Sequence, residues 1–74
     1  MSDKKKILIC DDDQSIVEVL QIILEENNFQ VTVLLNGKGI EKRVLSFHPD
    51  LILLDLWMPS IGGKEIIKIL NAID

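Results

Sequence analysis

The sequence has only one cysteine and no long apolar run. One cysteine cannot form an internal disulfide, which fits a reducing compartment, so we expect a cytoplasmic protein. No apolar stretch approaches the roughly 18 residues of a membrane span. The lysines at positions 4–6 are followed by four apolar residues before Asp11 interrupts the run, so a secretory signal is not expected. The sequence therefore predicts no membrane association.

An excess of basic residues is also lacking. Eight lysines and arginines stand against twelve acidic residues, which gives a net charge of −4. This acidic balance argues against direct binding of nucleic acid, whose phosphates attract basic surfaces. At 74 residues the chain is one domain or less, and a chain this short buries about 60% of the surface that its unfolded form exposes. We therefore expect a marginal core.

Apolar segments alternate with segments of helical periodicity along the chain. Short apolar runs bounded by turn residues predict strands at residues 6–10, 29–35 and 50–55. The uninterrupted apolar runs at residues 7–10 and 51–54 are typical of buried strands in a parallel sheet. Apolar residues spaced three and four apart predict one helix that ends at Asn27 and Asn28, and others over residues 39–47 and 64–72, the last after a loop at residues 58–63. This βαβαβα order predicts an α/β fold with a parallel sheet and right-handed crossovers.

The first helix carries the clearest signals. Its N-cap is either Asp13 or Ser15, and Ser15 with Glu18 fits a capping box. Its apolar face is predicted to consist of Ile16, Val17, Val19, Leu20, Ile23 and Leu24. The apolar face of the second helix is predicted to consist of Ile40, Val44, Leu45 and Phe47. His48 ends that helix because Pro49 disfavours a helical backbone at the preceding residue.

Carboxylates follow two of the predicted strands. Asp11, Asp12 and Asp13 come directly after the first strand, and Asp55 closes the third. The carboxyl ends of parallel strands form the edge at which open α/β sheets bind ligands. Acids brought together there repel each other, so we expect a divalent cation to hold them. Two plainer interpretations remain: the consecutive acids only cap a helix, or Asp55 is an ordinary acid at a strand end.

Two motifs resemble those of a known family. Residues 7–13 are ILICDDD and residues 49–59 are PDLILLDLWMP, with Gly62 and Gly63 after them. An aspartate pair after the first strand, together with D-x-x-M-P after the third, resembles the receiver domain of response regulators in two-component signalling. The resemblance runs over the whole chain at the right spacing. It implies a flavodoxin-like fold whose parallel strands take the order 2-1-3.

The resemblance also implies phosphotransfer. It identifies Asp55 as the acceptor of a phosphoryl group from a histidine kinase or a phosphotransfer protein. It assigns Mg²⁺, with Mn²⁺ as an alternative, to the carboxylates of Asp11, Asp12 and Asp55 and the backbone carbonyl of Trp57. Magnesium prefers oxygen ligands and neutralises charge during phosphoryl transfer, which agrees with this set. Such a domain modifies its own carboxylate and is not an enzyme that turns over.

The chain departs from the family pattern in several places. The family fold has five βα units and residues 1–74 provide three, so we expect the N-terminal part of a receiver domain. The fourth strand, which ends in Ser or Thr, and the fifth, which ends in Lys, are missing, and Lys64 and Lys68 do not match that lysine. Gly62 stands where the family commonly has Asp, and Trp57 stands where a smaller or polar residue is usual. These 74 residues alone are therefore expected to be incompletely competent.

Two other function classes stay open. An open third-strand edge at residues 51–54 would pair with another chain, so a self-associating structural fragment, in the form of a homodimer, is one alternative. A phosphatase-like enzyme with an aspartate nucleophile is the other, because Asp11-x-Asp13 formally matches the D-x-D of such enzymes. Cys10 is predicted to be a small buried side chain, and His48 an ordinary loop residue.

Overall fold

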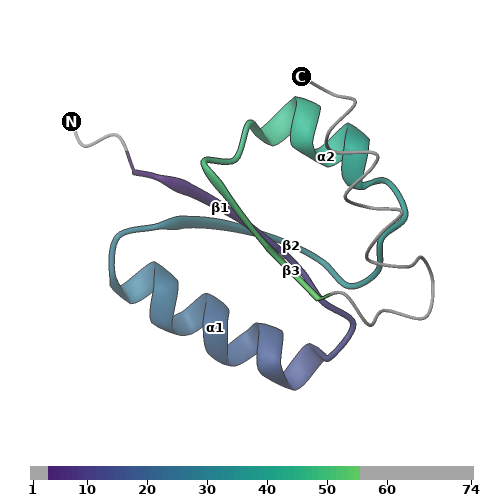
Figure 1. Ribbon diagram of the computed structural model, residues 1–74. Helices are drawn as coiled ribbons and strands as arrows, with labels where there is room; N and C mark the ends of the chain where they lie inside the picture. The colour runs from purple at the N-terminus through teal and green to yellow at the C-terminus, as the bar shows by residue number, and fades with distance from the viewer. Residues whose placement is uncertain (1–3, 56–74) are drawn as a thin grey trace.

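The fold is a parallel sheet with a helix on each face. The computed structural model describes residues 4–55. Its elements are β1 (Lys6–Cys10), α1 (Gln14–Glu26), β2 (Gln30–Leu34), α2 (Ile40–Phe47) and β3 (Leu51–Leu54). The strand order is β2-β1-β3, as predicted, and α1 and α2 lie on opposite faces of the sheet (Figure 1). Trp57, the loop predicted at 58–63 and the helix predicted at 64–72 lie outside the described residues.

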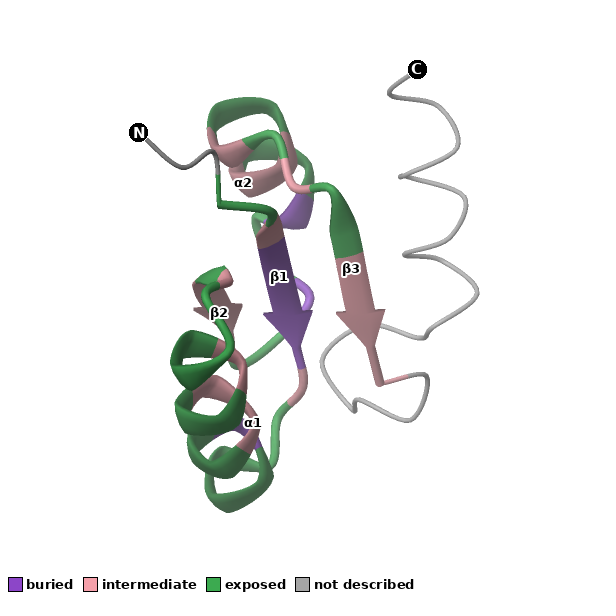
Figure 2. Cartoon of the chain, turned by 90° about the vertical axis from the view of Figure 1, so that its left-hand side faces the viewer, coloured by how far each residue is buried: buried purple, intermediate pink, exposed green. Residues whose placement is uncertain are grey.

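The central strand β1 is the most buried element. It pairs in parallel with β2 on one side and with β3 on the other. Its residues 7–10 are all buried, and Figure 2 shows this strand as the main buried segment of the sheet. An uninterrupted apolar run suits such a strand because both of its faces are covered.

Side chains of β1 alternate between two small hydrophobic clusters. On one face of the sheet, Leu8 and Cys10 pack with Ile40 of α2. On the other face, Ile7 and Ile9 pack with Val17 of α1. Each cluster has few fully buried members, which agrees with the marginal core expected for so short a chain.

The start of α1 is set by Asp13. Its side chain accepts hydrogen bonds from the backbone N–H groups of Ser15 and Ile16, which satisfies donors that the first helical turn leaves free. Asp13 is therefore the N-cap, and the alternative that placed Ser15 there, with Glu18 in a capping box, is wrong because Ser15 lies inside the helix. The helix ends at Glu26 with Asn27 as its C-cap, which agrees with the predicted end at Asn27 and Asn28.

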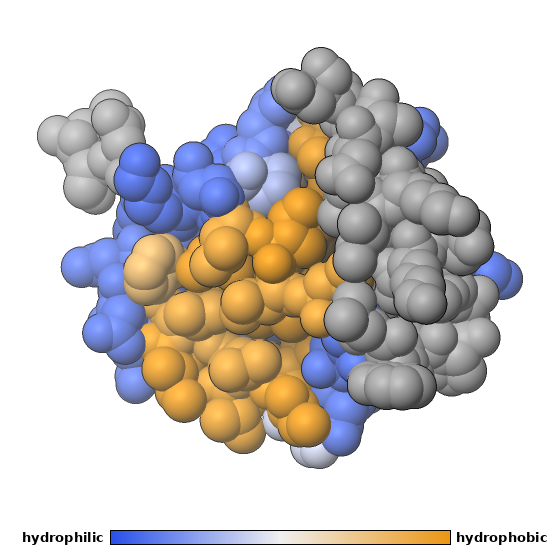
Figure 3. Space-filling view, in the orientation of Figure 1, coloured by the Kyte–Doolittle hydropathy of each residue, from blue (hydrophilic) through white to orange (hydrophobic). Residues whose placement is uncertain are grey.

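The buried face of α1 is narrower than predicted. Val17 is buried, and Leu20 and Leu24 pack against the same cluster. Ile16 and Ile23, by contrast, are each 49% exposed and Val19 is 56% exposed, so the assignment of these three residues to the buried face is wrong. The reason is the placement of α1, which packs mainly against β2 and turns one row of side chains to the sheet. The next row of side chains on α1 is exposed and contributes to an apolar surface that Figure 3 shows in orange.

Only part of the predicted face of α2 is covered. Ile40 is buried and Val44 packs against its cluster. Leu45 is 53% exposed, which corrects its assignment to that face. The backbone of His48 is left-handed, with φ of 54°, and this conformation ends the helix before Pro49, as expected.

A polar contact fastens α2 to the outer strand β2. Nη1 of Arg43 donates to Thr32 Oγ1 at 2.6 Å and to the Val33 carbonyl at 3.2 Å. In the parallel ladder Leu34 bonds toward β1, because its carbonyl accepts from Asp11 N–H. Strand residues alternate in the direction of their hydrogen bonds, so the Val33 carbonyl points away from β1. Arg43 therefore covers part of the outer edge of β2.

The third strand is less buried than predicted. Leu51 is 52% exposed, and the other three residues of β3 are half-buried. Within residues 4–55, β3 pairs only with β1, so no strand among these residues covers its second edge. The prediction of a buried strand is therefore wrong for Leu51.

Candidate functional site

The carboxyl ends of β1 and β3 continue their hydrogen-bond ladders by one residue. The N–H of Asp11 donates to the Leu34 carbonyl at 3.0 Å, and the N–H of Asp55 donates to the Cys10 carbonyl at 2.9 Å. The backbone of both acidic residues is thus fixed by neighbouring strands. Because the backbone of such a site is already held by the strands, it needs little rearrangement when a ligand binds.

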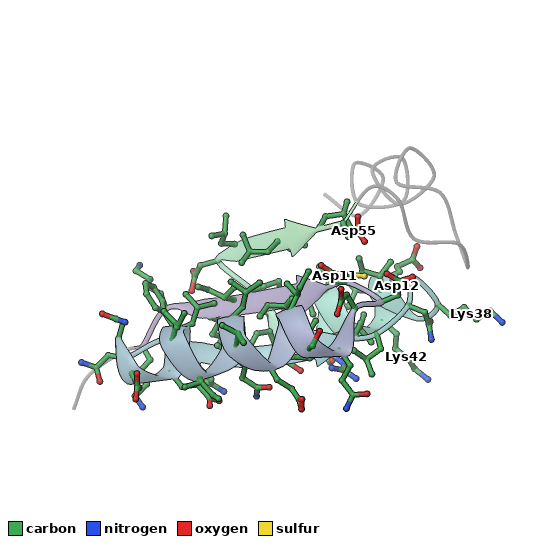
Figure 4. The ribbon with its side chains drawn as sticks, turned by 90° about the horizontal axis from the view of Figure 1, so that it is seen from below. Asp11, Asp12, Lys38, Lys42 and Asp55 are labelled. Carbon is green, nitrogen blue, oxygen red and sulfur yellow. The ribbon has the colours of Figure 1, made fainter. Side chains whose placement is uncertain are left out.

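Three carboxylates meet at this edge of the sheet. Asp11, Asp12 and Asp55 each place one carboxylate oxygen within 4.8 Å of the others. Asp11 and Asp55 are half-buried and Asp12 is exposed. Figure 4 shows their side chains gathered at one end of the sheet. Like charges this close repel each other. The repulsion is strongest where water, which screens charges, is partly excluded.

The donor set at this edge fits a hard divalent cation. Carboxylate oxygens are the ligands that Mg²⁺ prefers, and it commonly binds through one or two carboxylates while keeping several waters. Lys38 and Lys42 lie toward the same end of the sheet, but both side chains extend away from the three carboxylates (Figure 4). Neither of these two lysines therefore supplies the positive charge that the carboxylates require.

An apolar groove leads to the carboxylates. It has a volume of about 400 Å³ and is lined by Ile9, Asp11, Leu20, Leu53, Leu54 and Asp55. Its apolar lining comes from β1, α1 and β3. Its apolar wall lowers the local dielectric constant beside Asp11 and Asp55, which strengthens their attraction for a cation.

The thiol of Cys10 lies beneath the carboxylates and stays neutral. Burial, and then the negative charges of Asp11 and Asp55, raise the pKa of Cys10 from 9.0 to about 11. Its Sγ donates to the Asn36 carbonyl at 3.6 Å. Cys10 is buried and behaves as the small apolar side chain that was predicted, because a thiol and not a thiolate is present at neutral pH.

The third acid of the run, Asp13, does not join the group. Its Oδ1 accepts from the Ser15 hydroxyl at 2.7 Å in addition to the two backbone bonds of the cap. The hydrogen bond from the Ser15 hydroxyl, followed by that from Ile16 N–H, lowers the pKa of Asp13. One contact escaped prediction: Asp13 N–H donates to Asp11 Oδ1 at 2.9 Å. The D-x-S spacing signals the cap but not this bond.

This geometry, with acids at the ends of β1 and β3 in a 2-1-3 sheet, can be compared with known proteins. A sequence model of the response regulator receiver domain matches residues 7–74. The chain belongs to this family. Receiver domains of response regulators are parts of two-component systems and generally interact with kinases. No helix in the described part of this receiver domain is long and apolar enough to cross a membrane.

Curated relatives of this receiver domain are longer response regulators. It is 36% identical over 69 residues to the DNA-binding response regulator MtrA of Mycolicibacterium smegmatis. It is 41% identical over 64 residues to the alkaline phosphatase synthesis transcriptional regulatory protein PhoP of Bacillus subtilis. These matches cover 93% and 86% of this chain, but 30% and 27% of the relatives. The chain thus spans less than a third of their length.

Solved structures agree on the fold. The receiver domain of Francisella response regulator 1452 is similar with a TM-score of 0.84 at 32% identity, over 93% of this chain and 57% of that one. The crystal structure of FixJ-N is similar with a TM-score of 0.82 at 23% identity, over 99% of this chain and 58% of that one, a likeness of fold alone. The flavodoxin-like fold predicted for this receiver domain is therefore confirmed.

The raised pKa of Cys10 predicts that its thiol reacts slowly with alkylating reagents. Because the thiolate is the reactive form, iodoacetamide should modify native Cys10 at least about tenfold more slowly than the urea-unfolded chain at the same mildly alkaline pH. Mass spectrometry of timed samples measures both rates, and equal rates would contradict the prediction.

The same pKa predicts a pH dependence of stability. The folded state holds the Cys10 proton more tightly than the unfolded state, so this stabilisation is complete below pH 9.0 and is lost as the pH rises toward about 11. Urea midpoints of the native protein and of Cys10→Ala should therefore differ in their pH dependence across this range.

Proposed function

We propose that this receiver domain accepts a phosphoryl group on Asp55, donated by a histidine kinase or a phosphotransfer protein. The observation that supports this proposal is the convergence of Asp11, Asp12 and Asp55, from the ends of two strands, within 4.8 Å. Family membership adds to it, because receiver domains belong to two-component systems. The domain is proposed to be modified on its own carboxylate and not to turn over as an enzyme.

The cation is proposed to be Mg²⁺, with Mn²⁺ able to replace it. Asp11, Asp12 and Asp55 would hold it through carboxylate oxygens, and Trp57 would add its backbone carbonyl. When bound, the cation neutralises charge on the carboxylates and on the phosphoryl oxygens, which lets an anionic nucleophile approach an anionic group.

The remaining chemistry belongs to the chain itself. A carboxylate oxygen of Asp55 attacks phosphorus, the bond from phosphorus to the donor nitrogen breaks, and the electron pair stays on that nitrogen, which then takes up a proton. The product is an acyl phosphate. The hydrogen bond from Asp55 N–H to the Cys10 carbonyl fixes the backbone of the nucleophile at the carboxyl end of the sheet, which favours in-line attack.

A phosphatase-like mechanism with Asp11 as nucleophile and Asp13 as acid is less well supported. The Asp13 carboxylate is engaged by Ser15 and Ile16, and these hydrogen bonds lower its pKa. A general acid needs the opposite, a raised pKa near the working pH. Asp13 therefore lacks the proton that it would have to give to the leaving group in the first step of such an enzyme.

Self-association is a second proposed property. Leu51 is half exposed on β3, and Ile16, Val19 and Ile23 are exposed on α1. A monomer rarely exposes an apolar surface of this kind, and an uncovered strand edge pairs readily with another chain. Within residues 4–55 the second edge of β3 has no partner strand, and a homodimer joined through β3 would cover it.

The cation site predicts a measurable response to Mg²⁺. Trp57 is the only tryptophan and follows Asp55 by two residues, so its fluorescence should change as Mg²⁺ is added. Asp12→Asn should weaken the apparent affinity at least about tenfold because a ligand is lost. Glu18→Gln removes the same charge from the exposed surface of α1 and should leave the affinity within about twofold. A flat titration for the native protein would contradict the site.

Phosphorylation should be specific for one carboxylate. In a complete receiver domain that contains these residues, a small acyl phosphate with Mg²⁺ should label Asp55 alone, as read by mass spectrometry of peptides. Asp55→Asn should abolish the label, whereas Asp50→Asn, at the other end of β3, should retain it. Labelling should be weak in the 74 residues by themselves, because they lack the family's Ser or Thr and Lys contacts. A label on Asp11 would favour the phosphatase-like mechanism.

Self-association should depend on Leu51. Sedimentation velocity at micromolar concentration should show a dimer of the 74-residue chain. Leu51→Lys should shift it to monomer, because a charge on a strand edge opposes pairing. Leu45→Lys, equally exposed but on α2, should leave the dimer intact. A compact native monomer would be the contrary result.

A further inference from the structure

Asp13 connects the first turn of α1 to the carboxylate group. Its side chain accepts from Ser15 and Ile16, and its backbone N–H donates to Asp11 Oδ1 at 2.9 Å. One residue therefore makes the helix cap with its side chain and contacts Asp11 with its main chain. The backbone of Asp13 is extended, with φ of −89° and ψ of 99°, and this conformation is the one that an N-cap requires.

The bond from Asp13 N–H restricts a side chain that is otherwise free to rotate. The backbone of Asp11 is fixed by the Leu34 carbonyl, but its carboxylate can turn about two side-chain bonds. A hydrogen bond to Oδ1 fixes the plane of the carboxylate. A carboxylate oxygen accepts more than one contact, so the restraint leaves lone pairs for a cation on the side of Asp12 and Asp55.

We propose that Asp13 is a positioning residue for the cation site, acting through Asp11 and not as a ligand. The inference rests on the proposed cation site and adds a determinant of its affinity. The cap made by the Asp13 side chain holds residues 13–15 in place, and the cap in turn keeps Asp13 N–H directed at Asp11. Groups that orient metal ligands in this way typically alter metal affinity by about tenfold or more when they are lost.

Two substitutions separate the cap from the charge. Asp13→Asn and Asp13→Ala remove the same negative charge, but asparagine still offers an oxygen to cap the helix and alanine does not. Ser15→Ala keeps every charge and removes the hydroxyl that donates to Asp13 at 2.7 Å. Asn27→Ala removes a hydrogen bond to the Ile23 carbonyl at the other end of α1, and so weakens the helix without touching Asp11.

The experiment measures the affinity of each variant for Mn²⁺, from the electron paramagnetic resonance signal of the free ion, on the 74-residue chain. Asp13→Ala should bind about fivefold to tenfold more weakly than Asp13→Asn, and Ser15→Ala about twofold to threefold more weakly than the native protein. Asn27→Ala should bind like the native protein. Circular dichroism of each variant checks that α1 is still formed.

The contrary results are distinct. If Asp13→Ala and Asp13→Asn bind equally and Ser15→Ala matches the native protein, the effect is one of charge alone and the positioning role is overturned. Equal weakening by Asn27→Ala and Asp13→Ala would overturn it too, because helix stability would then explain both. If Asp12→Asn binds Mn²⁺ as tightly as the native protein, the cation site itself is wrong, and the positioning role fails with it.

Discussion

The double pairing of β1 is the constraint on which the rest of the structure depends. Because β1 hydrogen-bonds to strands on both of its edges, its register with each of them is fixed. The same ladders, extended by one residue, fix the backbone of Asp11 and Asp55. A slip of one residue in β3 would turn its apolar side chains to the wrong face and move Asp55 away from Asp11. The site is thus a property of sheet register as much as of the acids themselves.

The same arrangement sets an electrostatic conflict at one edge of the sheet. Asp11 and Asp55 are half-buried next to each other, and their charges help to raise the pKa of the Cys10 thiol beneath them. Two negative charges held together oppose folding, whereas a ligand that binds only the folded state stabilises it. A cation at this edge would therefore contribute to the stability of the fold and to its chemistry together.

Features set by local pattern could be predicted from the sequence. The buried run at residues 7–10 and the end of α1 beside Asn27 agree with the structure, and so does the strand order that the family resemblance implies. The proximity of the three carboxylates could also be predicted, because parallel strands end at a common edge. The local predictions succeed because periodicity and chain breakers can be read from the order of the residues, whereas the strand order comes from the family resemblance.

Features set by the placement of one element on another could not be predicted. Periodicity assigned Ile16 and Ile23 to the core of α1, but the helix packs mainly against β2 and turns only the row of Val17 to the sheet. Leu51 was expected to be buried, and its exposure depends on what lies beside β3. The bond from Asp13 N–H to Asp11 is likewise a product of helix position, since the capping signal alone concerns only the helix.

Arg43 determines which edge of the sheet can accept a further strand. Its guanidinium occupies the Val33 carbonyl on the outer edge of β2 and also holds Thr32 beside it. A strand arriving there would have to displace a charged hydrogen bond and leave a guanidinium without its partners, which is costly. No described residue guards β3 in the same way, and its exposed residue is a leucine. Within residues 4–55, Arg43 thus blocks the outer edge of β2, and the second edge of β3 is the one at which a further strand, whichever chain supplies it, can pair.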